Sequence, residues 1–305
     1  MLSVAKTSPL IERLFAQTAA LSAAFSRNRA RFRLPLLLLA LALFLGGSIF
    51  SFRQLELDPG DLRMVPLLAL VLLIAPAAVV YSAINMMLMG KAICVPVGFA
   101  RGLRVSVYAQ AAELLPIPGG TIVRAAALMR CGGGGMKSTG IVLAFALLWI
   151  AFAALGGGWA LLGFGHVGQS LFAGGMIVVI AINFWIGRSY GWKIAFVASG
   201  LRLVGLALVA VRMVIAFAVL GLALQWAGAF GFAFGVILGG AASIVPAGLG
   251  IGESISALVA VPLAIDPAAA FLAVAIGRLI GLGVNMLGVV GFMALDARTS
   301  GQGDI

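Results

Sequence analysis

The stretch Ser243-Ile-Val-Pro246-Ala-Gly248-Leu-Gly250-Ile-Gly252-Glu253-Ser254 combines a proline, three alternating glycines and a carboxylate inside an apolar run. A helix cannot run smoothly through it, because proline lacks a backbone donor and glycine is a poor helix former. Irregular backbone at membrane depth is tolerated only where protein or a polar cavity satisfies it, and an acid there is a functional hypothesis by default. We therefore predict a helix break at Pro246, Gly248, Gly250 and Gly252, with Glu253 beside it.

A second segment of the same kind lies within residues 89–139. Its centre is Glu113-Leu-Leu-Pro116-Ile-Pro118-Gly119-Gly120-Thr121-Ile-Val-Arg124, followed by an alanine-rich piece and then Gly132–Gly135. The segment is too polar for one membrane span and too apolar for an ordinary loop. We predict two short helices that meet at Pro116, Pro118, Gly119 and Gly120 as a re-entrant hairpin.

The composition assigns the chain to integral membrane proteins. Its 305 residues are 63% hydrophobic and 10% charged, whereas a soluble domain has about 25% charged residues. The net charge of +11 does not indicate nucleic acid binding, because the cations lie in clusters between apolar runs, as topology signals do. Cys94, Cys131 and His166 have no metal-site spacing. We expect no cofactor, no metal and no catalytic residue.

Apolar runs long enough for a hydrocarbon core of about 30 Å predict an all-α fold with six spans, at residues 34–52, 64–88, 140–163, 168–187, 203–227 and 267–295. The expected domains are a basic amphipathic segment at 1–33 that lies on the membrane surface, a membrane domain at 34–296 and a polar tail at 297–305. Arg188, Lys193 and Arg202 are assigned to a polar connection at 188–202.

The distribution of cations predicts the topology. If both broken segments return to the side from which they enter, 16 Lys and Arg residues lie on the side of the two termini and 2 lie on the other side. Cytoplasmic loops carry the excess of Lys and Arg. We therefore expect a multi-pass protein of the inner (plasma) membrane with cytoplasmic N- and C-termini.

The same topology contains a repeat. A span, a broken segment and a span at about 64–163 correspond to the same series at about 203–295. The two units are three crossings apart and are therefore inverted, so one hairpin enters from the cytoplasm and the other from outside. Inverted repeats whose broken helices meet near the midplane are typical of transporters, with the substrate at the break.

Four charged residues are predicted to gather at mid-depth. Arg212 and Arg278 lie well inside their spans, and Arg124 and Glu253 follow the two breaks. These groups should face one another or a wet cavity, with about two positive charges in surplus, as suits a lipid phosphate. Several alternatives stay open, since Glu253 could form only a structural ion pair with Arg278 or Arg124, and Arg212 could bind backbone carbonyls or snorkel. Glu113 could instead pair with Arg101 or Arg104 at headgroup level.

Three motifs resemble those of a known family. They are Pro-x-Gly-x-Gly-x-Gly-Glu at 246–253, Pro-x-Pro-Gly-Gly-x-x-x-Arg at 116–124 and the arginine at 278. The chain is similar over about 34–295 to the lysylphosphatidylglycerol synthase transmembrane-region family and to the flippase half of multiple-peptide-resistance proteins. The resemblance implies lipid handling or translocation. The chain departs from the family pattern at Thr121, where an acid often follows the glycine, and at Gly252, where an arginine often precedes the glutamate.

These observations lead to one favoured function. We expect a flippase or transporter for a lipid with an anionic headgroup, with Arg124, Arg212, Glu253, Arg278 and Glu113 as substrate-binding or gating residues. The alternative is a non-catalytic accessory protein that presents membrane lipids to a separate synthase or glycosyltransferase. An intramembrane enzyme is the weakest possibility, because the chain has no paired His and Asp and no activated nucleophile.

Overall fold

The computed structural model describes residues 38–114, 118–241 and 248–300. All regular secondary structure in these ranges is helical. Pro116 and Pro246 lie outside the described residues. The helices are Leu38–Gln54, α2 (Met64–Ala69), the π-helical turn η2 (Leu70–Ile74), α3 (Ala75–Ala92), α4 (Phe99–Ala112), α5 (Gly119–Arg130), α6 (Gly135–Ala160), α7 (His166–Tyr190), α8 (Trp192–Val219), α9 (Trp226–Ala241), α10 (Ile251–Ala260) and α11 (Pro267–Ser300). The predicted all-α fold is confirmed for the described part of the chain.

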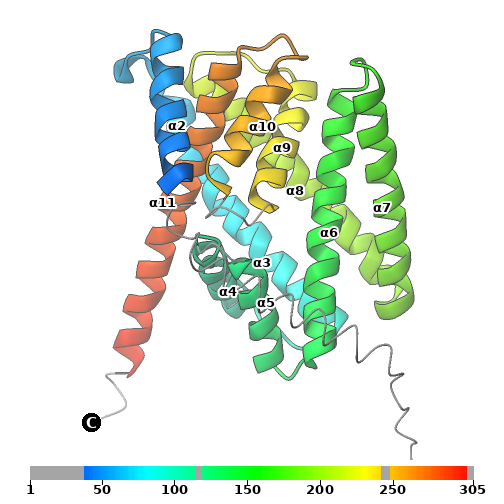
Figure 1. Cartoon of the computed structure of the whole chain (residues 1–305). Coiled ribbons are helices and arrows are strands. Elements are labelled where there is room, and N and C mark those ends of the chain that lie inside the picture. Colours follow the sequence, from blue (N-terminus) through cyan, green and yellow to red (C-terminus); the bar gives the residue numbers. More distant parts are fainter. Residues whose placement is uncertain (1–37, 115–117, 242–247, 301–305) are drawn as a thin grey trace, which may run out of the picture.

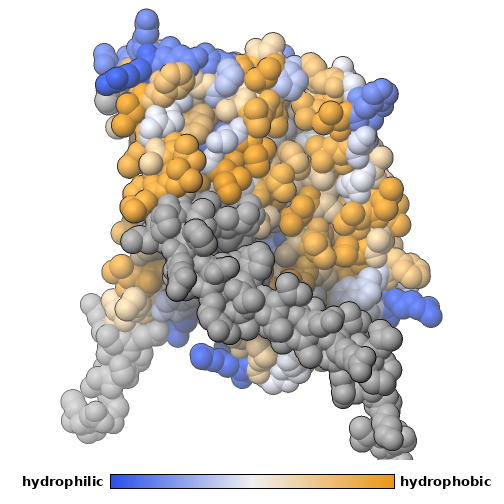
Figure 2. Space-filling model, in the orientation of Figure 1, coloured by the Kyte–Doolittle hydropathy of each residue, from blue (hydrophilic) through white to orange (hydrophobic). Residues whose placement is uncertain are grey.

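Five helical segments are long and apolar enough to cross a membrane: Met64–Ala92, Gly135–Ala160, His166–Tyr190, Trp192–Val219 and Pro267–Leu295. Their most apolar windows have mean hydropathies of 1.9 to 2.5. Figure 2 shows apolar side chains over the middle of one face, with hydrophilic residues mainly at its two ends. The fold therefore belongs to a helical membrane protein.

The first predicted span, at residues 34–52, is described only from residue 38 onward. Its described part is the apolar helix Leu38–Gln54, which falls below the length of the five long helices. At the other end of the chain, α11 continues to Ser300. Residues 297–300 were predicted to belong to a polar tail and are instead helical.

The predicted polar connection at 188–202 is wrong. Helix α7 ends at Tyr190 and α8 begins at Trp192, so only Gly191, with a φ of 97°, separates them. Arg202 is a buried residue within α8, with 6% of its surface exposed. The error arose because a cation inside an apolar run was taken for a topology signal, whereas Nη1 and Nη2 of Arg202 donate hydrogen bonds within the protein.

Two pairs of short helices occupy opposite ends of the molecule (Figure 1). Helices α4 and α5 pack together at the lower end of the view, and α9 and α10 pack together at the upper end. The α6–α7 turn is also at the upper end, and α11 runs from the upper to the lower end. Helix breaks were predicted near 113–120 and 246–252, in segments that include residues outside the described ranges. Among the described residues, α4 and α5 are separate helices, and residues 248–250 before α10 are not α-helical.

Glycines allow the α9–α10 hairpin to close. Gly248 and Gly250 have φ values of 65° and 80°, in the left-handed region that favours glycine. A Cβ on Gly239 would meet the backbone of Gly252, so the two helices approach each other without side chains between them. The alternating glycines are therefore required by a turn and by a close helix contact.

The buried apolar residues form two large clusters. One involves α3, α5, α6, α7 and the first part of α8, with Phe145 and Leu148 at its centre. The other lies among η2, the later part of α8, α9, α10 and the start of α11, with Phe217 and Phe232 stacked. Helix α8 contributes to both clusters.

Candidate functional site

A cavity of about 200 Å³, with both polar and apolar residues in its wall, lies among η2, α3, α4, α8, α9 and α11. Its polar lining consists of Gln110, Glu113, Arg212, Arg278 and Asn285. Leu70 and Ile74 of η2 contribute to its apolar wall. The cavity thus brings together three residues that the sequence predicted for a site, namely Glu113, Arg212 and Arg278, from three separate helices.

The π-helical turn beside the cavity has a local cause. Pro76 has no backbone N–H and cannot donate to the carbonyl of Leu72. In the preceding turn, the N–H of Ala75 bonds to the carbonyl of Leu70, five residues earlier. Single π turns within α-helices occur frequently at functional sites, and here the turn supplies Leu70 and Ile74 to the cavity wall.

Glu253 and Arg278 form a buried ion pair between α10 and α11. The Nε of Arg278 lies 2.8 Å from Oε1 of Glu253, whose side chain is fully buried. Neither carboxylate oxygen accepts a well-aligned hydrogen bond within the described part of the chain, so the contact is mainly electrostatic. Of the three arginines predicted as partners for Glu253, Arg278 is the one that forms the ion pair.

Two local features favour this pair. Glu253 lies in the first turn of α10, where the partial positive charge of a helix N-terminus stabilises an anion. Gly252 leaves room for the guanidinium, because a Cβ there would contact Nη2 of Arg278.

Arg212 is the cation of the cavity wall that has no counter-ion among the described residues. Among the described residues it forms no ion pair and no hydrogen bond, and its Nε is buried. It lies within electrostatic range of both Arg278 and Glu253. Gly277 of α11 makes room for it, since a Cβ there would lie 3.0 Å from Nε of Arg212. The side chain therefore carries a positive charge into the cavity wall.

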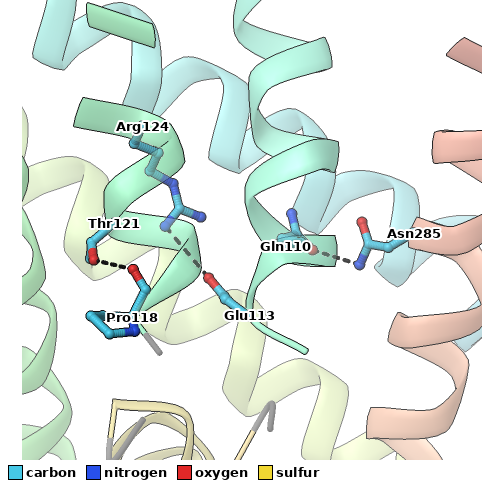
Figure 3. Close-up of polar contacts among 6 residues, drawn as sticks. All are labelled: Gln110, Glu113, Pro118, Thr121, Arg124 and Asn285. Carbon is cyan, nitrogen blue, oxygen red and sulfur yellow. Dashed lines mark hydrogen bonds and ion pairs between the residues drawn. The ribbon is translucent and has the colours of Figure 1, made fainter. Parts of the chain in front are cut away.

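Glu113 and Arg124 form a second ion pair, across the α4–α5 hairpin (Figure 3). The Nη1 of Arg124 lies 3.5 Å from Oε1 of Glu113, and the side chains are 20% and 48% exposed. Of the alternatives left open for Glu113, pairing with Arg101 or Arg104 is not the one that the structure has. Arg101 donates to the sulfur of Cys131, and the guanidinium of Arg104 lies over the ring of Phe292.

The break before α5 is also held by local contacts. A Cβ on Gly119 would meet the carbonyl of Ala112, and one on Gly120 would meet Glu113. Thr121 donates a hydrogen bond of 2.6 Å from Oγ1 to the carbonyl of Pro118 (Figure 3). Thr121 therefore closes the first turn of α5.

The charge balance differs from the predicted one. Arg124 and Arg278 each have a glutamate partner, and Arg212 has none within the described ranges. With all five groups ionised, one positive charge remains in excess. The expected surplus of two was too large because Glu113 had been left out of the balance. Arg124 contributes to the hairpin and does not belong to the residues that line the cavity.

Sequence reasoning missed Arg202 as a structural residue. Its Nη1 and Nη2 donate to the hydroxyl of Tyr81 and to the carbonyl of Phe145, both at 3.0 Å. The guanidinium also lies over the rings of Phe145 and Trp149. The apolar residues on both sides of Arg202 were the signal that could have identified it as an intramembrane residue.

A hydrogen bond between α4 and α11 completes the site. Asn285 donates from Nδ2 to Oε1 of Gln110 at 2.6 Å (Figure 3). The bond joins two helices whose residues lie 175 positions apart in the sequence. The same kind of contact joins α7 and α8, where Ser199 donates to Asn183.

Comparison with protein-family models, with curated proteins and with solved structures gives no significant match to this chain.

Proposed function

We propose that the protein is a lipid flippase or transporter, in which the cavity binds the anionic headgroup while the acyl chains stay in the surrounding bilayer. The observation that carries the proposal is Arg212, a cation in the wall of a cavity between the two hairpins, without a counter-ion in the described residues. An uncompensated charge at the centre of a membrane helix costs about 2.5–3.5 kcal/mol on insertion scales. A bound phosphate offsets this cost, and the planar guanidinium matches its geometry.

The arrangement of the helices supports alternating access in this proposal. Helices α4–α5 and α9–α10 would be re-entrant hairpins that enter from opposite sides of the membrane (Figure 1). With the long helices that flank them, they would form two inverted repeats, at about 64–163 and 203–295. Rocking of one repeat against the other would expose the cavity to each leaflet in turn.

The size of the cavity limits what enters it. At about 200 Å³ it has room for roughly seven waters at about 30 Å³ each. This suffices for a phosphate with a small headgroup and excludes a whole lipid. Figure 2 shows a small hydrophilic area recessed at mid-height in the apolar face, which is consistent with headgroup access from the lipid side.

The proposal locates the protein in the inner (plasma) membrane, with both termini cytoplasmic. The excess of Lys and Arg on the side of the termini supports this orientation. The excess persists when Arg202 is removed from the count, because a single buried residue changes a large difference very little.

Transport in proteoliposomes tests the proposed function. Vesicles with the purified protein would carry an anionic phospholipid with a fluorescent acyl chain, and dithionite would report its exchange between leaflets. The protein should accelerate this exchange, and Arg212→Gln should slow it about 10- to 100-fold, because a hydrogen bond to a charged group contributes about 1.5–3 kcal/mol and 1.4 kcal/mol is a factor of ten.

Arg188→Gln is the matched control, since it removes the same charge from an exposed position near the end of α7. This variant should transport at the wild-type rate. The absence of acceleration for any anionic lipid, or equal losses in the two variants, would overturn the proposal. Lipid binding that depends on Arg212 but brings no exchange would favour an accessory protein that presents lipid to a separate enzyme.

A further inference from the structure

The amide pair in the cavity has a defined orientation. The Nδ2 of Asn285 donates both to the carbonyl of Gly281, at 2.8 Å, and to Oε1 of Gln110, at 2.6 Å. A backbone carbonyl can only accept, so Nδ2 must face Gly281. Since Nδ2 uses its second proton toward Gln110, the atom of Gln110 that faces it must be the acceptor Oε1.

This orientation leaves one acceptor and one donor for a ligand. Asn285 has 92% of its surface buried. Its Oδ1 is among the buried atoms and accepts no hydrogen bond from any described residue. The Nε2 of Gln110, a partly buried residue in the cavity wall, donates no hydrogen bond to any described residue. Leaving the buried Oδ1 of Asn285 without a donor costs about 1–3 kcal/mol. A hydroxyl group satisfies both atoms, since it donates and accepts at once.

The charges of the cavity restrict the ligand further. The ion pairs Arg278–Glu253 and Arg124–Glu113 are neutral as units, so the single excess charge is that of Arg212. One guanidinium neutralises one negative charge, which corresponds to a phosphodiester. The ammonium of a zwitterionic headgroup would have to compete for carboxylates that already have arginine partners.

Building on the proposed function, we infer that the substrate is a phosphodiester lipid with an uncharged, hydroxyl-bearing headgroup. Arg212 binds the phosphate, and Gln110 and Asn285 bind a headgroup hydroxyl. The amide pair is therefore the specificity-determining part of the cavity, and it selects among lipids of equal charge.

The test compares three lipids with the same fluorescent acyl chain. Phosphatidylglycerol and phosphatidylethanol carry the same charge, but only the first has headgroup hydroxyls, and phosphatidylcholine is zwitterionic. The wild-type protein should move phosphatidylglycerol at least about tenfold faster than either of the others, which corresponds to one hydrogen-bonded hydroxyl at 1.4 kcal/mol.

Substitutions locate the selectivity. Asn285→Leu, similar in shape, should slow phosphatidylglycerol to the rate of phosphatidylethanol and leave the latter unchanged. Asn85→Leu is the matched control, because Asn85 is also buried, donates to the carbonyl four residues earlier and has an unsatisfied Oδ1, but lies outside the cavity lining. It should keep the wild-type ratio between the two lipids.

Three outcomes would overturn the inference. They are equal wild-type rates for phosphatidylglycerol and phosphatidylethanol, an unchanged ratio in Asn285→Leu, and uptake of a soluble glycerophosphodiester without lipid exchange. The first two leave the proposed function standing if exchange still depends on Arg212. The comparison of wild-type rates needs no variant, so poor folding of a variant does not prevent the test.

Discussion

The Nε of Arg278 lies 2.8 Å from Oε1 of Glu253, and these side chains are only 8% and 0% exposed. The contact joins α11 to the first turn of α10 and places two opposite charges deep inside an apolar helical protein. Breaking a buried pair by removing one partner costs much more than removing both, because a single buried charge is left uncompensated. A variant that removes one partner of the Glu253–Arg278 pair should therefore be less stable than a variant that removes both.

Glu253→Gln should lower the free energy of unfolding by about 3–5 kcal/mol, since Arg278 would remain charged and buried. The double variant Glu253→Gln with Arg278→Gln should recover a large part of that loss. Denaturation by SDS in mixed micelles measures both effects. The free energy lost in the double variant is compared with the losses in Glu253→Gln and in Arg278→Gln. A loss at least as large as the sum of these two would contradict the assignment of the pair.

Glu113→Gln should have a much smaller effect, below about 1 kcal/mol, because the Glu113–Arg124 pair is partly exposed and its atoms are 3.5 Å apart. The same denaturation experiment compares it directly with Glu253→Gln. If the two variants were equally unstable, the difference in burial between the two ion pairs would not be the deciding factor.

Gly252→Ala should destabilise the protein by about 1–3 kcal/mol, because the new methyl would contact Nη2 of Arg278 and force a shift in a packed site. Gly283→Ala is the control, since nothing lies within 4 Å of a Cβ there and alanine favours the helix. Thermal unfolding in detergent should show a lower midpoint for the first variant and an equal or higher midpoint for the second.

Tyr81→Phe should cost about 1.5–3 kcal/mol, because it removes the hydroxyl that accepts from the buried guanidinium of Arg202 at 3.0 Å. Tyr108→Phe, at a partly buried tyrosine without a hydrogen bond to any described residue, should change stability by less than about 0.5 kcal/mol. Equal losses of stability in the two variants would show that the hydrogen bond from Arg202 to Tyr81 does not stabilise the fold.

Gly277→Ala tests the position of Arg212 without removing its charge. A Cβ at this site would lie 3.0 Å from Nε of Arg212, closer than almost all real contacts, so the guanidinium must shift. Headgroup exchange in proteoliposomes should fall while the fold is retained. Unchanged exchange would indicate that the guanidinium adapts, and that its placement is less restricted than the close contact suggests.

The membrane class, the helical fold and the two helix breaks could be predicted from the sequence, because they depend on local properties. Apolar runs of sufficient length specify membrane helices, and proline and glycine interrupt them wherever they cluster. The residues that carry charge into these apolar runs, Arg212, Glu253 and Arg278, were recognisable for the same reason.

The partners of those charges were decided only by the tertiary structure. Local spacing allowed Glu253 to pair with Arg124, Arg212 or Arg278, and the packing of α10 against α11 beside Gly252 selects Arg278. The α4–α5 hairpin likewise brings Arg124 to Glu113, and the crossing of α3, α6 and α8 buries Arg202. A charge inside a membrane helix can be recognised from the sequence, but its counter-ion comes from a distant helix. Only the fold therefore determines that Arg212, a residue of the cavity wall, has no carboxylate partner among the described residues.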